Sequence, residues 1–440
     1  MNISPNLKVQ IKIISSMYLA YGAIMVLRQM ITILGPAMLA DESLGLTKTD
    51  LGDFAAYGTI GALMGKLIWG PLTDKIGGRK TFLIGIVLTA IFVIAFGFTA
   101  NIMILTIFSA LIYCLKSSGW PALTKLIGNW FHPSRYGTVW SILSTSSSAS
   151  VVIGTLFFGW LLSFLSWQTV AVISAGIAFT ICIICFFTLG EKPTDEAFIA
   201  EQAPKEISHE QSEELRKAEE NLSNHPLKNT SLQQGIFAFI KSNRFWLIVV
   251  MMMMLTCAMA FLDFVSIYLM EVYKLTPSNA AMVSSVFPMG SLGGLIVSIF
   301  FYDRFSKKSL TRILTINLAV ATLAVVTLKY LPGFGLDNSI NYMIAIACIF
   351  VFGFCISPAY YIPMSVFSIE LGGPHSATLV CLLDAFGFAA SASFGFIGGR
   401  LADSSGGWDS FMNMITLIAL ISTLCVWGFM NAEYKASHKS

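Results

Sequence analysis

The sequence predicts an all-α membrane protein in which twelve transmembrane helices form two six-helix bundles. Three observations lead to this prediction: the composition, the number of long apolar runs and a polar segment near the middle of the chain. Of the 440 residues, 55% are hydrophobic and only 12% are charged, and the mean hydropathy is +0.74. A soluble domain usually carries about 25% charged residues. A chain this poor in charge cannot cover itself with a water-facing surface, so it belongs in a bilayer.

Twelve apolar runs are long enough to span the membrane, because a helix needs about 20 residues to cross the hydrocarbon core. We place them at 12–40, 51–73, 81–99, 101–124, 137–164, 168–190, 245–273, 279–302, 309–330, 340–367, 375–402 and 408–430. Only a short turn around Asn101 separates the third run from the fourth. The first run is too long for the core of a signal peptide, and we interpret it as a retained span.

A charged segment separates the two sets of six spans. It contains "EQSEELRKAEE", which we expect to be helical, and few large apolar residues. The predicted organisation is an N-terminal six-helix bundle at 1–190, a cytoplasmic linker at 191–244 and a C-terminal six-helix bundle at 245–440. The halves resemble each other, since "SWQTVAVIS" begins the sixth span and "GWDSFMNMI" the twelfth. The linker is either a tether or a binding segment for a partner.

Lysine and arginine residues concentrate in the loops that follow the second, fourth and eighth spans and in both terminal segments. Because these residues favour cytoplasmic loops, we expect both termini on the cytoplasmic side of the plasma membrane, which in a bacterium is the inner membrane. The sequence has no basic and aromatic face that would favour nucleic-acid binding. We expect a monomer without a cofactor or a metal site.

One charged stretch between the second and third spans has a recognisable pattern. "GPLTDKIGGRK" matches G-x-x-x-D-K/R-x-G-x-R/K-R/K through Gly70, Asp74, Lys75, Gly77, Arg79 and Lys80. Glycines permit a tight turn and a close approach of helices. The pattern resembles the signature of the major facilitator superfamily. The resemblance implies that the aspartate pairs across the interface between the halves, so that these six residues form a conformational latch. The alternative is an anchor that fixes only the topology.

Five further stretches resemble the organophosphate:phosphate antiporter family within that superfamily: "YLAYGAIMVLRQM", "GALMGKLIWGPLTD", "GWPALTKLIGNWF", "FLDFVSIYLMEVYKL" and "GWDSFMNMI". The resemblance implies an anion-binding arginine in the first span, here Arg28, and a lysine in the second, here Lys66. Two family features are absent. The arginine of the seventh span falls at about Ala258, and the histidine of the fifth falls at about Ser146. These departures weaken the interpretation as a phosphate exchanger.

Three cations lie deep within predicted spans of the N-terminal half: Arg28, Lys66 and Lys116. A charge near the bilayer centre costs about 3 kcal/mol on insertion scales, so such a residue faces a cavity or a partner. An arginine can grip a carboxylate or phosphate with two parallel bonds, whereas a lysine acts as a point charge. We interpret Lys125, farther along the chain, as an anchor at the cytoplasmic end.

Aromatic residues accompany these cations at helical spacing. Tyr21 lies on the face of Arg28, while Tyr113 and Trp120 lie on the face of Lys116. Hydroxyl and indole donors beside a cation make a plausible cradle for an oxyanion. Tyr360 and Tyr361, in the proline-containing tenth span, are further candidates for substrate contact.

The C-terminal half has deep acids instead: Asp263 in the seventh span and Asp384 in the eleventh. Burial raises the pKa of a carboxyl group and a nearby cation lowers it, so either acid could carry a proton or pair with one of the cations. Asp263 could equally be a structural acid. We therefore predict a secondary transporter that moves a small organic anion by alternating access, coupled to protons.

Other functions remain open at this point. The substrate could be a phosphate ester, a polycarboxylate or an acidic chelate, and the coupling could be exchange for inorganic phosphate. A transporter-like sensor of sugar phosphate is a further alternative. The five histidines are dispersed, and no nucleophile–base pair or nucleotide-binding loop occurs, so the sequence does not favour an enzyme.

Overall fold

The computed structural model describes residues 5–39, 41–46, 48–193, 198, 216, 220, 224–275, 283–335, 337–402 and 404–438. Within these ranges the regular structure is entirely helical. Helices suit the hydrocarbon core because they satisfy their backbone hydrogen bonds internally, where no water is available.

The first half supplies six spans, of which one is broken. The helices are α1 (Pro5–Leu39), α2 (Lys48–Ile76), α3 (Gly78–Gly97), α4 (Ile102–Lys116), α5 (Gly119–Trp130), α6 (Tyr136–Leu161) and α7 (Trp167–Thr188). The predicted boundary at Asn101 is present, and the side chain of this residue caps α4 by accepting from the Ile104 amide at 3.1 Å. The fourth predicted span is two helices, because Ser117 and Ser118 form a turn between them, although the backbone of both stays in the right-handed helical region.

The second half repeats this plan. Its helices are α11 (Asn243–Met259), α12 (Leu262–Val272), α14 (Val286–Phe301), α15 (Lys307–Tyr330), α16 (Asn338–Gly372), α17 (Ser376–Ala402) and α18 (Gly407–His438). The seventh predicted span is α11 followed by α12. The predicted start of the eighth span, at 279–282, lies outside the described residues, as does most of the expected linker helix. The described end of the linker forms α10 (Leu232–Lys241), which meets α11 at 81°.

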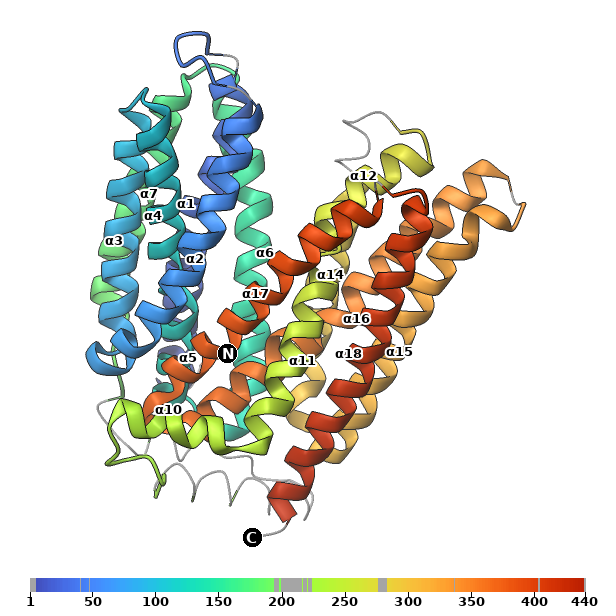
Figure 1. Ribbon diagram of the computed structural model, residues 1–440. Coiled ribbons are helices and arrows are strands. Elements are labelled where there is room, and N and C mark those ends of the chain that lie inside the picture. The colour runs from blue at the N-terminus through green and yellow to red at the C-terminus, as the bar shows by residue number, and fades with distance from the viewer. Residues whose placement is uncertain are drawn as a thin grey trace.

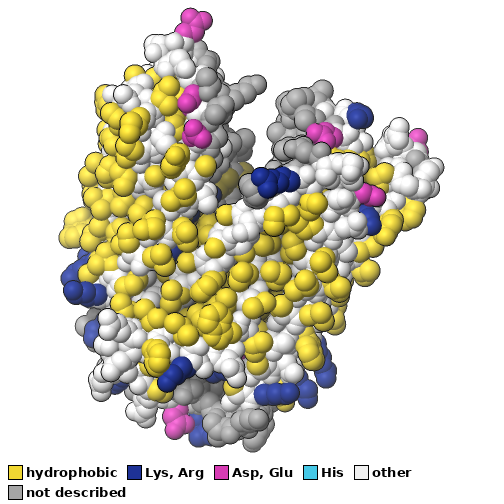
Figure 2. All heavy atoms as spheres, in the orientation of Figure 1, with side chains coloured by type: hydrophobic (Ala, Val, Ile, Leu, Met, Phe, Trp, Pro, Cys, Tyr) yellow, Lys and Arg dark blue, Asp and Glu magenta, His cyan; other side chains and the backbone are white. Residues whose placement is uncertain are grey.

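By length and hydropathy, nine helical segments among the described residues can cross a membrane. One of them, Asn338–Ala402, comprises both α16 and α17, and the bent pair α10–α11 adds a tenth segment. Apolar side chains cover the flanks of both bundles, and lysine and arginine side chains gather towards one end (Figure 2). The chain is therefore an integral membrane protein with the predicted twelve-helix architecture.

The two bundles converge at one end of the molecule and separate at the other (Figure 1). The turn after α2, helix α10 and the C-terminus lie at the convergent end, while Figure 2 shows a hollow between the halves at the opposite end. The contacts between halves are paired: α2 packs on α17, and α14 packs on α6. Each pair joins the second span of one half to the fifth span of the other, as an approximate two-fold relation requires.

The likeness of the two tryptophan-containing stretches has a structural counterpart. The indole of Trp167 donates to Asp41, just after α1, at 2.9 Å. The indole of Trp408 donates to Glu271, at the end of α12, at 2.8 Å. In each half, the sixth span is thus tied to the end of the first span.

Candidate functional site

A cavity of about 140 Å³ lies between the halves. It is lined by Tyr21, Met25, Arg28, Lys66, Lys116, Ser117, Trp120, Ser147, Tyr360, Tyr361, Met364, Asp384 and Phe388. The first half contributes through α1, α2, α4, α5 and α6, and the second contributes through α16 and α17. Seven of the eight residues proposed from sequence to bind substrate reach this one cavity.

The three cations of the first half meet there, although they come from three helices. Lys66 and Lys116 are 5% and 6% exposed, and Arg28 is half-buried with its Nε lacking a hydrogen-bond partner. Among the residues that the structure describes, no carboxylate pairs with Arg28 or Lys116. Buried charges are costly when unpaired, so these two cations are suited to an anion that enters the cavity.

Lys66 has an acidic partner from the other half. Its ammonium donates to Oδ2 of Asp384, and this pair joins α2 to α17 in the wall of the cavity. Asp384 is itself 7% exposed. The second predicted acid, Asp263, lies on α12, but its side chain is outside the described residues.

Aromatic rings form a wall that continues across the interface. Trp120 lies 5.7 Å from Tyr21 and 6.0 Å from Tyr361 between ring centroids, and Tyr361 lies 4.7 Å from Tyr360. The Trp120 indole nitrogen is buried and lacks a hydrogen-bond partner. A donor in this position can be satisfied by an oxygen of a bound molecule.

Tyr113 differs from the other seven residues because it does not line the cavity. Its ring lies beneath two cations, 5.5 Å from the Arg28 guanidinium carbon and 5.8 Å from the Lys116 nitrogen. The face of an aromatic ring attracts cations, so Tyr113 stabilises both cations from a position outside the cavity lining.

Sequence reasoning missed Phe388. Its ring centroid lies 5.8 Å from the Lys66 nitrogen and 5.7 Å from the Lys116 nitrogen. The available signal was its position one helical turn after Asp384, on the same face of α17. That signal is weak, because a phenylalanine in an apolar span is usually a packing residue.

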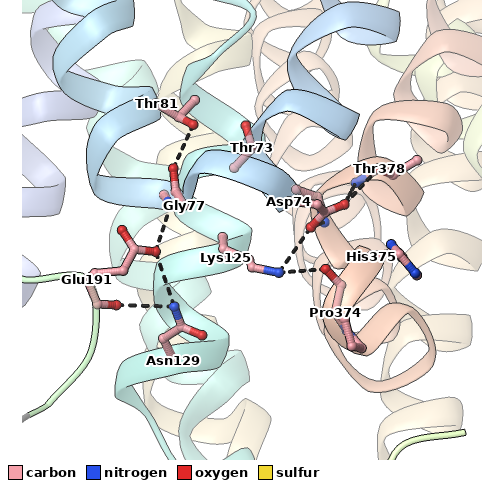
Figure 3. Close-up of polar contacts among 12 residues, drawn as sticks. Thr73, Asp74, Gly77, Thr81, Lys125, Asn129, Glu191, Pro374, His375 and Thr378 are labelled. Atoms are coloured by element: carbon pink, nitrogen blue, oxygen red, sulfur yellow. Dashed lines mark hydrogen bonds and ion pairs between the residues drawn. The ribbon is translucent and has the colours of Figure 1, made fainter. Parts of the chain in front are cut away.

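Figure 3 shows polar contacts around the motif, which spans the end of α2 and the start of α3. Asp74 accepts hydrogen bonds from the Ala377 and Thr378 amides at 3.2 and 2.8 Å and from the Thr378 hydroxyl at 2.7 Å. These donors begin α17, where the positive end of the helix dipole favours a carboxylate. Lys125 also donates to Asp74 at 3.1 Å and to the Pro374 carbonyl at 2.6 Å. Instead of a simple anchor, Lys125 is a link between the halves.

Both glycines of the motif meet a specific requirement. Gly77 has a φ of 91°, which favours glycine, and a Cβ there would lie 2.7 Å from the Glu191 carboxylate. Glu191 accepts from the Gly78 and Arg79 amides, at 2.8 Å each, at the start of α3. Gly70 lies against α17, since an added Cβ would come within 2.9 Å of the Cys381 Cβ.

The other motif cations face outward. Lys75 and Lys80 are exposed. Arg79 donates to the Phe186 carbonyl at 2.7 Å and stacks on its ring. None of the three reaches the opposite half in the contacts of the described residues.

A second carboxylate repeats the arrangement of Asp74 on the other side of the approximate two-fold axis. Asp303, just after α14, accepts from the Gly137 and Thr138 amides at 3.0 and 2.6 Å. These amides begin α6. We refer to Asp74 with the start of α17, and Asp303 with the start of α6, as the two interface latches.

The two family positions that lack a cation are buried and occupied by small residues. Ala258 is fully buried in α11. Ser146 is also buried, and its hydroxyl donates to the Tyr18 carbonyl at 2.8 Å. Neither position therefore supplies a positive charge, Ala258 in the second half or Ser146 in the first.

Residues 17–383 match the Major Facilitator Superfamily. The chain belongs to this family. Its members are transporters and not enzymes, and the chain is a secondary transporter. It is 24% identical to the "Probable hexose phosphate transport protein" of Chlamydia trachomatis serovar D, over 98% of this chain and 93% of that protein. It is 23% identical to the "Glucose-6-phosphate exchanger SLC37A2" of Xenopus laevis, over 80% of this chain and 74% of that protein.

Solved structures of the superfamily share the fold. The transporter FucP in the outward conformation superposes with a TM-score of 0.71 at 12% identity, over 96% of this chain and 98% of FucP. The proton:xylose symporter XylE superposes with a TM-score of 0.69 at 14% identity, over 97% of this chain and 96% of XylE. The family resemblance seen in the sequence is thus confirmed, as is the fold.

Proposed function

We propose that this superfamily member moves a small organic dianion of the phosphate-ester class across the plasma membrane, driven by the proton gradient. The observation that carries the proposal is the composition of the cavity. Three cations and one acid face it, so the excess of positive charge is two when the acid is ionised and three when it is protonated. A phosphate ester carries about −1.5 to −2 charge at neutral pH, which this excess can balance in either state. The relatives named for sugar phosphates support the same class.

Arg28 is the principal ligand of the anion in this proposal. Its guanidinium can hold two phosphate oxygens at once, and its Nε has no hydrogen-bond partner among the described residues. Lys116 supplies a second positive charge. Trp120 donates to a further oxygen, and Tyr21, Tyr360 and Tyr361 contact the organic part of the substrate. Tyr113 stabilises the cations without touching the substrate.

Asp384 is the coupling residue. The substrate anion and the Asp384 carboxylate compete for Lys66, so a proton on Asp384 releases Lys66 to the substrate. When the proton leaves, the Lys66–Asp384 pair re-forms and displaces the anion. Proton uptake and substrate binding are therefore favourable together, which is the requirement for symport.

Alternating access follows from the interface latches. Both latches lie at the convergent end, which carries the basic loops, and we assign this end to the cytoplasm because lysine and arginine favour that side. With both latches made, the cavity faces outward, and their release lets the two halves rock. The motif residues Gly70, Asp74 and Gly77 shape the first latch, while Lys75, Arg79 and Lys80 fix the topology. The protein acts as a monomer with both termini in the cytoplasm.

Exchange for inorganic phosphate is the second candidate. It is favoured by the description of one relative as an exchanger. It is disfavoured by Ala258, which leaves the second half without a cation where the resemblance implies an arginine. In an exchanger, Asp384 would serve only to hold Lys66 while the cavity is empty.

Uptake into proteoliposomes tests the proposal. We expect the purified protein to take up glucose 6-phosphate or glycerol 3-phosphate when the outside is acidic, without any internal substrate. Citrate and other polycarboxylates should compete poorly. If polycarboxylates are taken up and phosphate esters are not, the substrate class is wrong. If uptake requires internal phosphate and ignores the pH gradient, exchange is the function.

A further inference from the structure

Phe388 places one aromatic face against two buried cations. Its ring lies within 5.8 Å of the Lys66 nitrogen and 5.7 Å of the Lys116 nitrogen. Both lysines belong to the first half, on α2 and α4, whereas Phe388 belongs to α17 of the second half. The ring therefore sets a side chain of the second half against two cations of the first, in the wall of the cavity.

The two lysines under this ring have unequal partners. Lys66 pairs with Asp384, while Lys116 pairs with no carboxylate among the described residues. Lys116 contacts two rings instead, Tyr113 and Phe388. A ring face attracts a desolvated cation but brings no counter-charge, so Lys116 is left available to an anion.

Tyr113 and Phe388 are fixed to different helices and therefore to different charged residues. Tyr113 lies three residues before Lys116 on α4, so it moves with that lysine. Phe388 lies four residues after Asp384 on α17, so it moves with the carboxylate. Without the Phe388 ring, Lys66 and Lys116 would both be drawn to the single carboxylate of Asp384, because nothing else on α17 in the described structure attracts Lys116.

We propose that Phe388 is a positioning residue that assigns Asp384 to Lys66 and keeps Lys116 for the substrate anion. The inference rests on the proposed function, since it takes Lys116 as an anion ligand. It adds a determinant that is neither charged nor part of the latch motif. It also predicts that the affinity for substrate and the proton dependence of transport change together when the ring face is lost.

Phe388→Leu removes the ring face and keeps an apolar side chain. We expect the KM for glucose 6-phosphate uptake to rise about 2- to 30-fold, the range that a lost cation–π contact implies, with a much smaller change in kcat. We also expect the pH profile of uptake to shift, because Asp384 then interacts with two ammonium groups. Phe388→Tyr keeps the face and should restore both properties. Phe388→Met serves as a second apolar variant if the leucine variant does not fold.

Phe386→Leu is the matched control. It makes the same change two residues earlier on α17, where the ring packs against Phe245 and Trp246 and does not line the cavity. Equal behaviour of Phe388→Leu and Phe386→Leu would overturn the inference, as would a Phe388→Tyr variant as impaired as the leucine variant. Titration of the wild-type protein with inorganic phosphate and glucose 6-phosphate in detergent tests the proposed function separately from the role of Phe388. If neither ligand binds, the proposed function fails. If the ligands bind but Phe388→Leu behaves like Phe386→Leu, only the positioning role fails.

Discussion

The first half of the chain contributes Arg28, Lys66 and Lys116 to the cavity, whereas Asp384 is the one acidic or basic residue that the described part of the second half adds to its lining. At the convergent end the halves are instead alike. Asp74 accepts from the start of α17, and Asp303 accepts from the start of α6. The described structure is thus two-fold symmetric at the interface latches and asymmetric at the cavity.

This difference indicates what each region requires. Rocking of two bundles needs equivalent contacts on both sides of the axis, and a carboxylate at a helix N-terminus provides them. A proton-coupled anion site needs an excess of positive charge on one wall and a group that can gain or lose a proton on the other. Three predictions test this division and a fourth concerns the linker, from the largest expected effect to the smallest.

The ion pair between the halves should be the most costly contact to break. Lys66→Met or Asp384→Leu alone leaves one buried charge without its partner, which should lower the free energy of unfolding by about 3 kcal/mol. The double variant removes both charges and should recover most of the loss without recovering transport. Thermal unfolding in detergent at one pH measures all three. The Lys307–Glu370 pair, whose side chains are more exposed at 23% and 18%, is the control, and its two residues should show a much smaller coupling energy in the same set of variants. An equally small coupling energy between Lys66 and Asp384 would contradict a stabilising buried ion pair.

Arg28→Lys should abolish most substrate binding although it keeps the positive charge. The lysine loses the two-bond grip, and a charged hydrogen bond contributes about 1.5–3 kcal/mol, or roughly 10- to 100-fold in affinity. Isothermal titration with inorganic phosphate and glucose 6-phosphate measures the change. Near wild-type affinity in Arg28→Lys would show that the anion is held elsewhere.

The two interface latches should respond alike. Asp74→Asn and Asp303→Asn each remove a carboxylate from a helix N-terminus, which should favour opening of the convergent end by about 1 kcal/mol. Native Cys381 reports this opening, because it is buried against Gly70 at the interface. Its alkylation by N-ethylmaleimide should accelerate in both variants. Cys185, buried within the first bundle, should stay unreactive, and a response to only one of the two substitutions would argue against symmetric latches.

The docked end of the linker should loosen in acid. His225 contacts the Glu370 carbonyl at 3.3 Å, and Thr230 contacts the ring of His375 at 3.3 Å. Burial lowers the pKa of His225, and nearby His375 acts in the same direction. Docking is therefore favoured above the usual histidine pKa of about 6.5 and lost as the pH falls below it. Hydrogen exchange of residues 224–241 at pH 7.5 and 5.5 measures the effect, which His225→Gln should suppress.

Much of this organisation could be predicted from the sequence because membranes impose simple rules. Long apolar runs gave the spans, and buried charges such as Arg28 and Asp384 could be recognised because hydrocarbon excludes them. The break at Ser117 and Ser118 could not be predicted, since both flanking helices are apolar. The partner of Lys125 and the role of Phe388 were also inaccessible, because both depend on how two segments far apart in the sequence meet in space.

The central claim is that Asp384 couples protons to an anion bound by the cations of the first half. Asp384→Asn in proteoliposomes tests it most directly, because asparagine resembles the protonated carboxyl group. The account predicts that the variant binds glucose 6-phosphate and performs counterflow but no longer accumulates it under a pH gradient. Accumulation by Asp384→Asn at the wild-type level under the same gradient would contradict the account.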